Sequence, residues 1–275
     1  MTVSMPRRLS TWPPNAKLRK FREEIIAKAQ ERIGDYLYPK ISGEVGGRRR
    51  LIDQPPVLFH ISAKGFEEIV LDAMAGYRRS LPDERRVLFD RYRLEDIAIK
   101  AVGIGSVGTH CFVGLFFSAE NHPLLLQFKE ACPSVLEPYA GKSQYENHGQ
   151  RVVTGQRLMQ SASDIFLGWT HGRGGRDFYV RQLRDMKMSA QVEGASAVQH
   201  MLYAELCGRT LAHAHAKSGD AATISGYLGK SDAFDQAIGE FAAGYADQNE
   251  KDHAALVAAV KAGRIKALVE EEQEK

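Results

Sequence analysis

In the segment Ile97-Ala-Ile-Lys-Ala-Val-Gly-Ile-Gly-Ser-Val-Gly-Thr-His-Cys-Phe-Val-Gly-Leu-Phe-Phe117, a glycine-rich loop separates two apolar runs. The loop, Gly103 to Gly108, has the pattern G-x-G-x-x-G, which two unrelated phosphate-binding structures share. In a dinucleotide-binding fold the third glycine opens a helix. Here the residues after Gly108 are mostly aromatic or β-branched, and such residues favour a strand. The sequence therefore predicts a glycine loop between two antiparallel strands.

A lysine lies in the next predicted strand. A turn at Asn121-His-Pro123 is followed by the segment Leu124–Glu130. This segment is apolar except for Gln127, its single cation Lys129 and the terminal Glu130. Burying a lysine without an anion costs several kcal/mol, so a phosphate is a suitable partner. Protein kinases hold nucleotide phosphates with a glycine loop and a strand lysine of this kind. The alternative is that Lys129 points to solvent from an edge strand.

The following segments predict the rest of a kinase-like small lobe. A helix is expected over 143–162, with Val152, Met159 and then Phe166 at seven-residue spacing on its core side. Strands are expected over Ile165–Thr170 and Asp177–Leu183, followed by a hinge at Gln182–Lys187. A kinase helix presents a glutamate to the strand lysine. The candidates for that partner here are Glu146, Gln150 and Gln156.

The predicted fold class is α+β. A kinase-like small lobe, made of an antiparallel sheet of about five strands plus one helix, is flanked by helical N- and C-terminal regions. The expected regions are a flexible arm (1–16), a mainly helical region with a short hairpin (17–95), the lobe (96–190), a helical region (191–268) and a charged tail (269–275). The expected nucleotide-binding residues are Gly103, Gly105, Ser106, Gly108, Lys129, Gln182, Leu183 and Arg184.

The composition excludes several classes of protein. With 275 residues and 44% hydrophobic content, the chain is neither disordered nor of low complexity. The apolar run Cys111–Phe117 is too short to span a membrane, and the basic N-terminus has no apolar signal core. We therefore expect a cytoplasmic protein without a membrane partner. Cys111, Cys132 and Cys207 are odd in number and widely spaced, so we interpret them as reduced core residues.

The first hundred residues carry 20 basic and 14 acidic side chains. Nucleic-acid binding is not expected, because Arg48–Arg50 is a single short cluster without interleaved aromatic residues. A solvated basic face explains the excess. His213 and His215 are two residues apart and point away from each other on a helix, so no metal site is expected there.

The groups that would transfer a phosphoryl group are missing from the sequence. A kinase continues with H-R-D-x-x-x-x-N and D-F-G segments. Neither pattern occurs here, and the nearest asparagine downstream of Asp220 is Asn249. We therefore expect binding of ATP or another nucleotide with Mg²⁺ and an incomplete catalytic set, whose residues are unknown.

Several long motifs resemble the bacterial domain of unknown function 2252 family, over about Ala27 to Ile265. They are Gly103–Thr109, Leu126–Ala131, Pro133–Leu136, Asn147–Val153, Gly155–Gln160, Asp177–Lys187, Ser218–Asp220 and Gly226–Asp232. That family is distantly similar to protein kinases and aminoglycoside phosphotransferases. Its members carry G-D-x-H-x-x-N and D-F-D-like segments upstream of the glycine loop, and neither segment is present here. The resemblance implies that this chain corresponds to the C-terminal portion of a longer member.

Two hypotheses follow. The first is a kinase-like nucleotide-binding module that is catalytically incomplete. The alternative is a non-catalytic fragment or protein-interaction module of a split or truncated phosphotransferase-like protein. Its partner would be a separate chain that carries the missing catalytic segment.

Overall fold

The computed structural model describes residues 38–63, 65–101, 108–183 and 193–267. The chain divides into two compact units, Met1–Ser218 and Gly219–Lys275. The division falls inside the region 191–268 that the sequence predicts as one helical region. The predicted arm, residues 17–37 of the predicted helical region and the charged tail lie outside the described residues.

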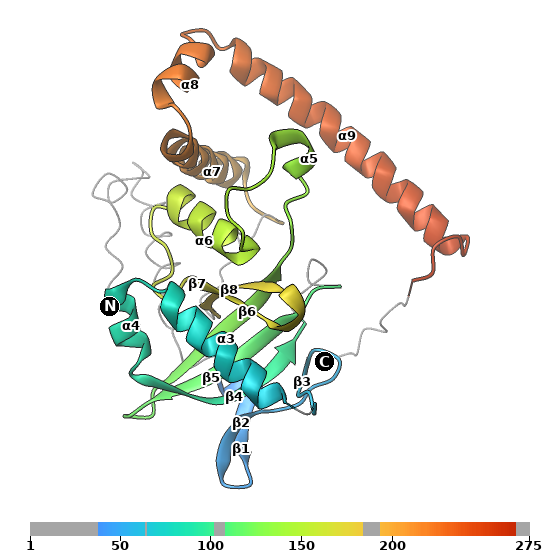
Figure 1. Cartoon of the computed structure of the whole chain (residues 1–275). Coiled ribbons are helices and arrows are strands. Elements are labelled where there is room, and N and C mark those ends of the chain that lie inside the picture. Colours follow the sequence, from blue (N-terminus) through green and yellow to red (C-terminus); the bar gives the residue numbers. More distant parts are fainter. Residues whose placement is uncertain (1–37, 64, 102–107, 184–192, 268–275) are drawn as a thin grey trace. The chain divides into compact units, whose positions relative to one another are not determined.

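The first unit is built on a six-stranded antiparallel sheet in the order β3-β4-β5-β6-β8-β7. Figure 1 shows the long strands side by side. Their bounds are β3 Leu58–Phe59, β4 Tyr92–Lys100, β5 Cys111–Ser118, β6 Pro123–Ala131, β7 Gly168–His171 and β8 Asp177–Gln182. The mixed α+β class and the antiparallel sheet are therefore confirmed.

The sheet differs from the prediction at its β3 side. The two-residue strand β3 adds a sixth strand, and β4 begins at Tyr92 instead of near Ile97. The pairing of β4 with β5 shifts between Leu94 and Asp96. A bulge of this kind interrupts the alternation of inward and outward side chains, which is the pattern that identifies a strand in a sequence.

One face of the sheet, here called the α3 face, carries Phe112, Phe128 and Phe178. It is covered by the helix α3 (Phe66–Ser80), which lies across the strands in Figure 1, and by α4 (Asp83–Phe89). The fully buried Tyr77 of α3 donates its hydroxyl hydrogen to the carbonyl oxygen of Phe166 at 2.6 Å. Each large apolar side chain buried here contributes roughly 1.5–3 kcal/mol. The aromatic residues of the sheet thus attach α3 firmly.

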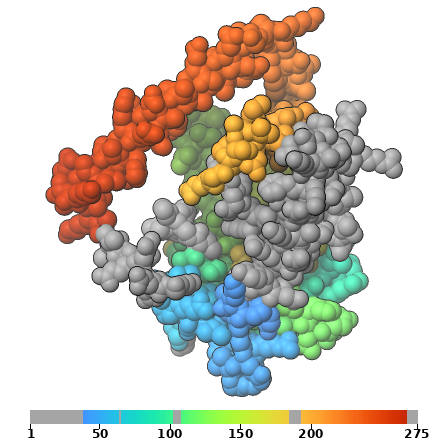
Figure 2. Space-filling model, turned by 180° about the vertical axis from the view of Figure 1, so that it is seen from behind, coloured from blue at the N-terminus to red at the C-terminus, as the bar shows by residue number. Residues whose placement is uncertain are grey.

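The opposite face, here called the lysine face, carries Cys111, Lys129 and Tyr179, which pair with one another across the strands. Each is next in the sequence to one of the three phenylalanines, because side chains alternate between the faces. Part of the lysine face is apolar and packs on the helix α2 (Tyr38–Ile41) and the hairpin of β1 (Ser42–Val45) and β2 (Arg48–Leu51). The hairpin projects from the sheet in Figures 1 and 2. This is the short hairpin that the sequence predicts within residues 17–95.

The helix α6 (His148–Met159) follows β6 and a short helix α5 (Glu137–Ala140). It begins five residues later than the predicted start at Ser143, because the Asn147 side chain accepts a hydrogen bond from the Gln150 N–H at 2.9 Å and caps the helix. Val153 is its fully buried residue. The predicted core stripe is therefore wrong: Met159 is exposed, and Phe166 lies beyond the helix end.

Glycine permits a close approach at the start of α6. A Cβ atom added to Gly149 would lie 2.3 Å from the carbonyl oxygen of Phe178 in β8, whereas one added to Gly155 would have nothing within 4 Å. Close to this contact, Asp177 accepts hydrogen bonds from the His148 N–H at 2.8 Å and from Asn147 at 3.0 Å. The helix and the strand are thus held together by both packing and hydrogen bonds.

The remaining helices are α7 (Ala197–Ser218) in the first unit, and α8 (Ala221–Leu228) and α9 (Ala233–Lys261) in the second. Asp220 caps α8: its carboxylate accepts the backbone N–H groups of Ala222 and Thr223, both at 2.9 Å, and these hydrogen bonds lower its pKa. Among the described residues, none of the helices combines the length and apolarity that crossing a bilayer requires. A cytoplasmic location stays a prediction.

The interpretation of the cysteines as core residues is only partly right. All three are free thiols, but only Cys111 is buried. Cys132 lies just past the end of β6, and Cys207 lies on an exposed part of α7. Both positions leave the thiol in contact with solvent.

Candidate functional site

Lys129 lies in the middle of the sheet. Its strand β6 has β5 on one side and β8 on the other, and Lys129 pairs with Cys111 and with Tyr179. The edge-strand interpretation of this lysine is therefore wrong. The side chain is half-buried, and its Nζ lies 6.0 Å from the centroid of the Tyr179 ring. At this distance the ring provides a weak cation–π contact, and no described carboxylate forms an ion pair with the lysine.

Two further cations share the lysine face. Arg181 pairs with Gln127 across β8 and β6, two positions from the Lys129 pair, and Lys100 ends β4 next to the start of β5. Burial raises the pKa of the Cys111 thiol, while the charges of Lys129, Arg181 and Lys100 act in the opposite direction. All three cations are therefore close enough to influence one buried thiol.

Gln127 connects these groups. It is almost fully buried, with 2% of its surface exposed. Its Oε1 accepts a hydrogen bond from the Arg181 Nε at 3.1 Å, and its Nε2 donates to the Cys111 Sγ at 3.5 Å. The amide thus fixes the direction of the Arg181 side chain on the sheet.

Within the described part of the chain, Lys100, Lys129 and Arg181 make no ion pair. Some other half-buried charges of this unit form ion pairs, whereas Arg151 and Arg157 donate to backbone carbonyl oxygens. For example, Glu130, on the α3 face, contacts the His110 Nδ1 at 2.7 Å and the Arg176 Nε at 3.4 Å. Half-buried cations without anions are costly. Among the described residues, the lysine face therefore carries three cations without a paired anion.

The predicted partners of Lys129 are not in contact with it. Glu146 is exposed and lies before the start of α6, and no described hydrogen bond joins Lys129 to Gln150 or Gln156. The late start of α6 explains part of this result, since Glu146 is not a helical residue. A lysine–glutamate pair of the kinase type is therefore absent from the described contacts.

The other predicted site residues are only partly described. Gly108 has a φ of 79°, a left-handed conformation that glycine adopts without strain. Gln182 ends β8 and is exposed, and the Leu183 N–H donates to the Leu125 carbonyl at 2.9 Å, so Leu183 continues along β6. Gly103, Gly105, Ser106 and Arg184 lie outside the described residues, as does most of the predicted hinge.

The sequence analysis missed a second polar cluster. His60 contacts the Asp53 Oδ1 through Nδ1 at 2.7 Å and the Asp96 Oδ2 through Nε2 at 3.0 Å. Asp96 is buried and also accepts the Leu51 N–H at 2.8 Å. The hydrogen bond with His60 is the main reason that the pKa of Asp53 is lowered. This cluster ties the β1–β2 hairpin to β4, and the only sequence signal for it is the acidic Asp96 before an apolar strand segment.

A family model described as "Uncharacterized protein conserved in bacteria (DUF2252)" matches residues 3–259. The chain belongs to the DUF2252 family. The resemblance that the sequence motifs indicate is thereby confirmed. Searches of the curated proteins and of the solved structures found no match.

No group of three or more His, Cys, Asp or Glu side chains suited to a metal lies among the described residues of this DUF2252 chain.

Proposed function

We propose that the lysine face binds the phosphates of a nucleotide, with ATP as the reference ligand. The observation that carries this proposal is the group of three half-buried cations, Lys100, Lys129 and Arg181, without an ion pair among the described residues. A triphosphate is a compact multiple anion, and charge-assisted hydrogen bonds from Lys and Arg suit it. Lys100 ends the strand before the glycine loop, Lys129 pairs with Cys111 at the start of the strand after it, and Arg181 lies two positions further into the sheet.

The order of the elements supports a kinase-like arrangement of this site. The chain runs through β4, the glycine loop, β5, the lysine strand β6, the helix α6 and then β7 and β8. In protein kinases the glycine loop covers the phosphates and the lysine of the third strand contacts them. Here β5 and β6 are neighbours, so Lys129 lies on the strand next to the one that leaves the loop.

The proposed activity is binding without complete catalysis. Asp220 is the acidic residue closest to a catalytic-loop position in the sequence, but its carboxylate accepts two backbone N–H groups as the cap of α8. A carboxylate engaged in this way is a poor acceptor for a substrate proton. Phosphoryl transfer would then require groups from a separate chain that carries the missing segment, with Mg²⁺ held jointly by the phosphates.

A thermal unfolding experiment with the full chain tests nucleotide binding. ATP with Mg²⁺ at about 100 times its Kd should stabilise the chain by about 2.7 kcal/mol. Lys129→Met keeps the length of the side chain and removes the charge, and we expect it to abolish most of the shift. Lys142→Met, at an exposed position outside the sheet, is the matched control and should keep the shift. No shift at millimolar ATP, or equal shifts in both variants, would contradict the proposal.

A second candidate function, a protein-interaction module, is favoured by α9. Phe234, Ile238, Phe241 and Tyr245 follow one another at helical spacing and are between 43% and 66% exposed. The rings of Phe241 and Tyr245 are stacked at 5.7 Å. An aromatic stripe of this size on a helix typically contacts another protein surface. A monodisperse monomer that binds no hydrophobic dye in sedimentation and fluorescence experiments would contradict this second candidate.

A further inference from the structure

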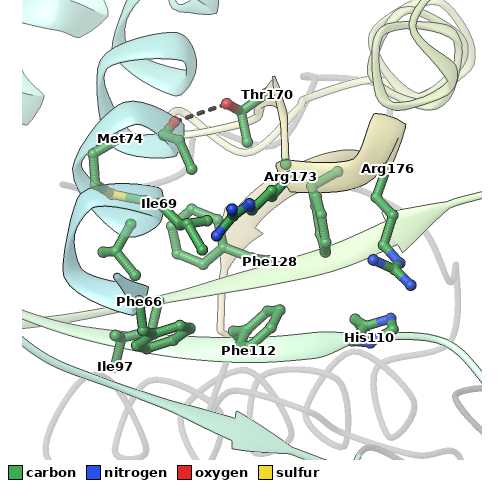
Figure 3. Close-up of a pocket in the computed structure, with 14 residues that line it drawn as sticks. Phe66, Ile69, Met74, Ile97, His110, Phe112, Phe128, Thr170, Arg173 and Arg176 are labelled. Atoms are coloured by element: carbon green, nitrogen blue, oxygen red, sulfur yellow. Dashed lines mark hydrogen bonds between the residues drawn. The ribbon is translucent and has the colours of Figure 1, made fainter. Parts of the chain in front are cut away.

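A separate pocket lies on the α3 face, opposite Lys129. It has a volume of about 160 Å³ and is enclosed by α3, the strands β4, β5, β6 and β8, and the turn between β7 and β8 (Figure 3). Its wall consists of Phe66, Ile69, Val70, Ala73, Met74, Ile97, His110, Phe112, Phe128, Thr170, Gly172, Arg173, Arg176 and Phe178. The proposed nucleotide site uses none of these side chains.

The interior of the pocket is aromatic. Phe66 comes from α3, and Phe112, Phe128 and Phe178 come from three adjacent strands of the sheet. The ring centroids of Phe112 and Phe178 are 6.0 Å apart, and those of Phe66 and Phe112 are 6.4 Å apart. An apolar cavity of about 150 Å³ accommodates one benzene-sized group. The pocket therefore has room for a single ring and not for a nucleoside.

The polar groups of the wall are gathered at one end. The Thr170 hydroxyl donates to the Ala73 carbonyl at 2.7 Å and is therefore already used. His110 and Arg176 both contact Glu130. Arg173 is exposed like them but differs in making no ion pair within the part of the chain that the structure describes.

The direction of Arg173 gives the pocket its chemical preference. In Figure 3 its side chain extends from the turn across the opening toward Ile69, with the ring of Phe128 beneath it. The turn is the 3-10 segment η3 (Arg173–Gly175), and its residue Gly174 has a φ of 74°. A planar guanidinium at the opening of an apolar cavity suits a carboxylate, which it can bind through two parallel hydrogen bonds.

We propose that this pocket binds a small aromatic monocarboxylate. The ring occupies the cavity between Phe112, Phe128 and Phe178, and the carboxylate contacts Arg173. A ligand of this size has about ten non-hydrogen atoms, so a Kd around the millimolar range or tighter is expected. The proposal does not depend on nucleotide binding, because the two sites lie on opposite faces of the sheet.

Calorimetric titration of the full chain with phenylacetate tests the proposal, and 2-phenylethanol serves as the neutral ligand with the same ring. Phenylacetate should bind at least about tenfold more tightly than the alcohol, the difference that one charge-assisted contact provides. Arg173→Gln should reduce phenylacetate to the affinity of the alcohol and leave alcohol binding unchanged. Arg48→Gln, an exposed arginine of the β1–β2 hairpin, is the matched control and should change neither affinity.

A filling variant tests the location. Ala73 lines the cavity from α3, and Ala73→Leu places additional carbon atoms inside it. We expect this variant to lose both ligands, while Lys129→Met keeps both. The proposal is overturned if phenylacetate does not bind at millimolar concentration, if hexanoate binds more tightly than phenylacetate, or if Arg173→Gln leaves phenylacetate binding unchanged. The last result remains decisive even if Ala73→Leu fails to fold.

Discussion

The same strands give the two faces of the sheet opposite chemistry. On the α3 face, Phe112, Phe128 and Phe178 stand in adjacent strands and bury their rings against α3. One residue earlier or later, Cys111, Lys129 and Tyr179 stand on the lysine face, where three cations make no ion pair among the described residues. Because side chains alternate along a strand, two neighbouring residues can have unrelated roles. The α3 face contributes to the stability of the fold, and the lysine face presents positively charged side chains.

The largest difference is expected between two neighbouring residues of β6. Phe128→Ala removes a ring that is 3% exposed and should cost about 3–5 kcal/mol of unfolding free energy, which is the usual cost of deleting a buried phenylalanine. Lys129→Met should change stability by only about 0.5 kcal/mol, because it removes a charge without a described partner. Urea denaturation followed by circular dichroism measures both values. Equal losses would show that Lys129 has a structural role.

A smaller difference is expected between two glycines of α6. Gly149→Ala forces the helix away from the Phe178 carbonyl and should cost about 1–3 kcal/mol, as overpacking does. Gly155→Ala meets nothing within 4 Å and should stabilise the chain by about 0.5–1 kcal/mol, because alanine is the better helix former. Thermal unfolding of the two variants should therefore shift the midpoint in opposite directions. Shifts of the same sign would contradict the close approach of α6 and β8.

The smallest expected effect is the loss of stability when acid protonates Glu130 on the α3 face. Burial tends to raise the pKa of Glu130, but hydrogen bonds from the His110 backbone and ring, together with the charges of His110 and Arg176, lower it below 4.5. A carboxyl whose pKa is lower in the folded state contributes stability above pH 4.5, and this contribution is lost as the pH falls through the folded-state pKa. The loss should be less than about 1 kcal/mol for a contact near the surface.

Glu130→Gln checks this effect. Denaturation of the wild-type chain and of this variant between pH 6 and pH 3 should give stability curves that converge in acid, because the variant has no carboxyl to protonate there. Parallel curves over that range would mean that Glu130 contributes nothing to the acid sensitivity of the chain.

The sequence predicted the parts of the fold that depend on local chemistry. The strands β5 and β6 were predicted closely, because Cys111–Phe117 and Leu124–Glu130 are rich in residues that favour strands. The start of β4 was not predicted closely, because its bulge interrupts the alternation of inward and outward side chains. The start of α6 was placed too early, because the cap at Asn147 is visible only once its hydrogen bond to Gln150 is known.

The candidate sites show the same limit. Lys129 could be singled out, because it is a lone cation in an apolar strand. The position of Lys100 and Arg181 on the same face as Lys129 could not be predicted, since it depends on which strands are neighbours. His60 and Asp96 are separated by 36 residues and meet only through the fold. The aromatic pocket likewise combines residues from α3, the sheet and the β7–β8 turn, and no short segment of the sequence contains it.

Because Cys111 is buried, the rate at which its thiol is alkylated reports how often β5 separates from β6. Its raised pKa reduces the fraction of thiolate, and its surface is only 3% exposed, so an alkylating reagent reaches it when β5 separates from β6. Cys132 and Cys207 are exposed and should react at once. Mass spectrometry of the alkylated chain should therefore record two fast modifications and one slow one. A ligand that bridges Lys100 of β4 and Lys129 of β6 spans β5 and should lengthen the slow phase.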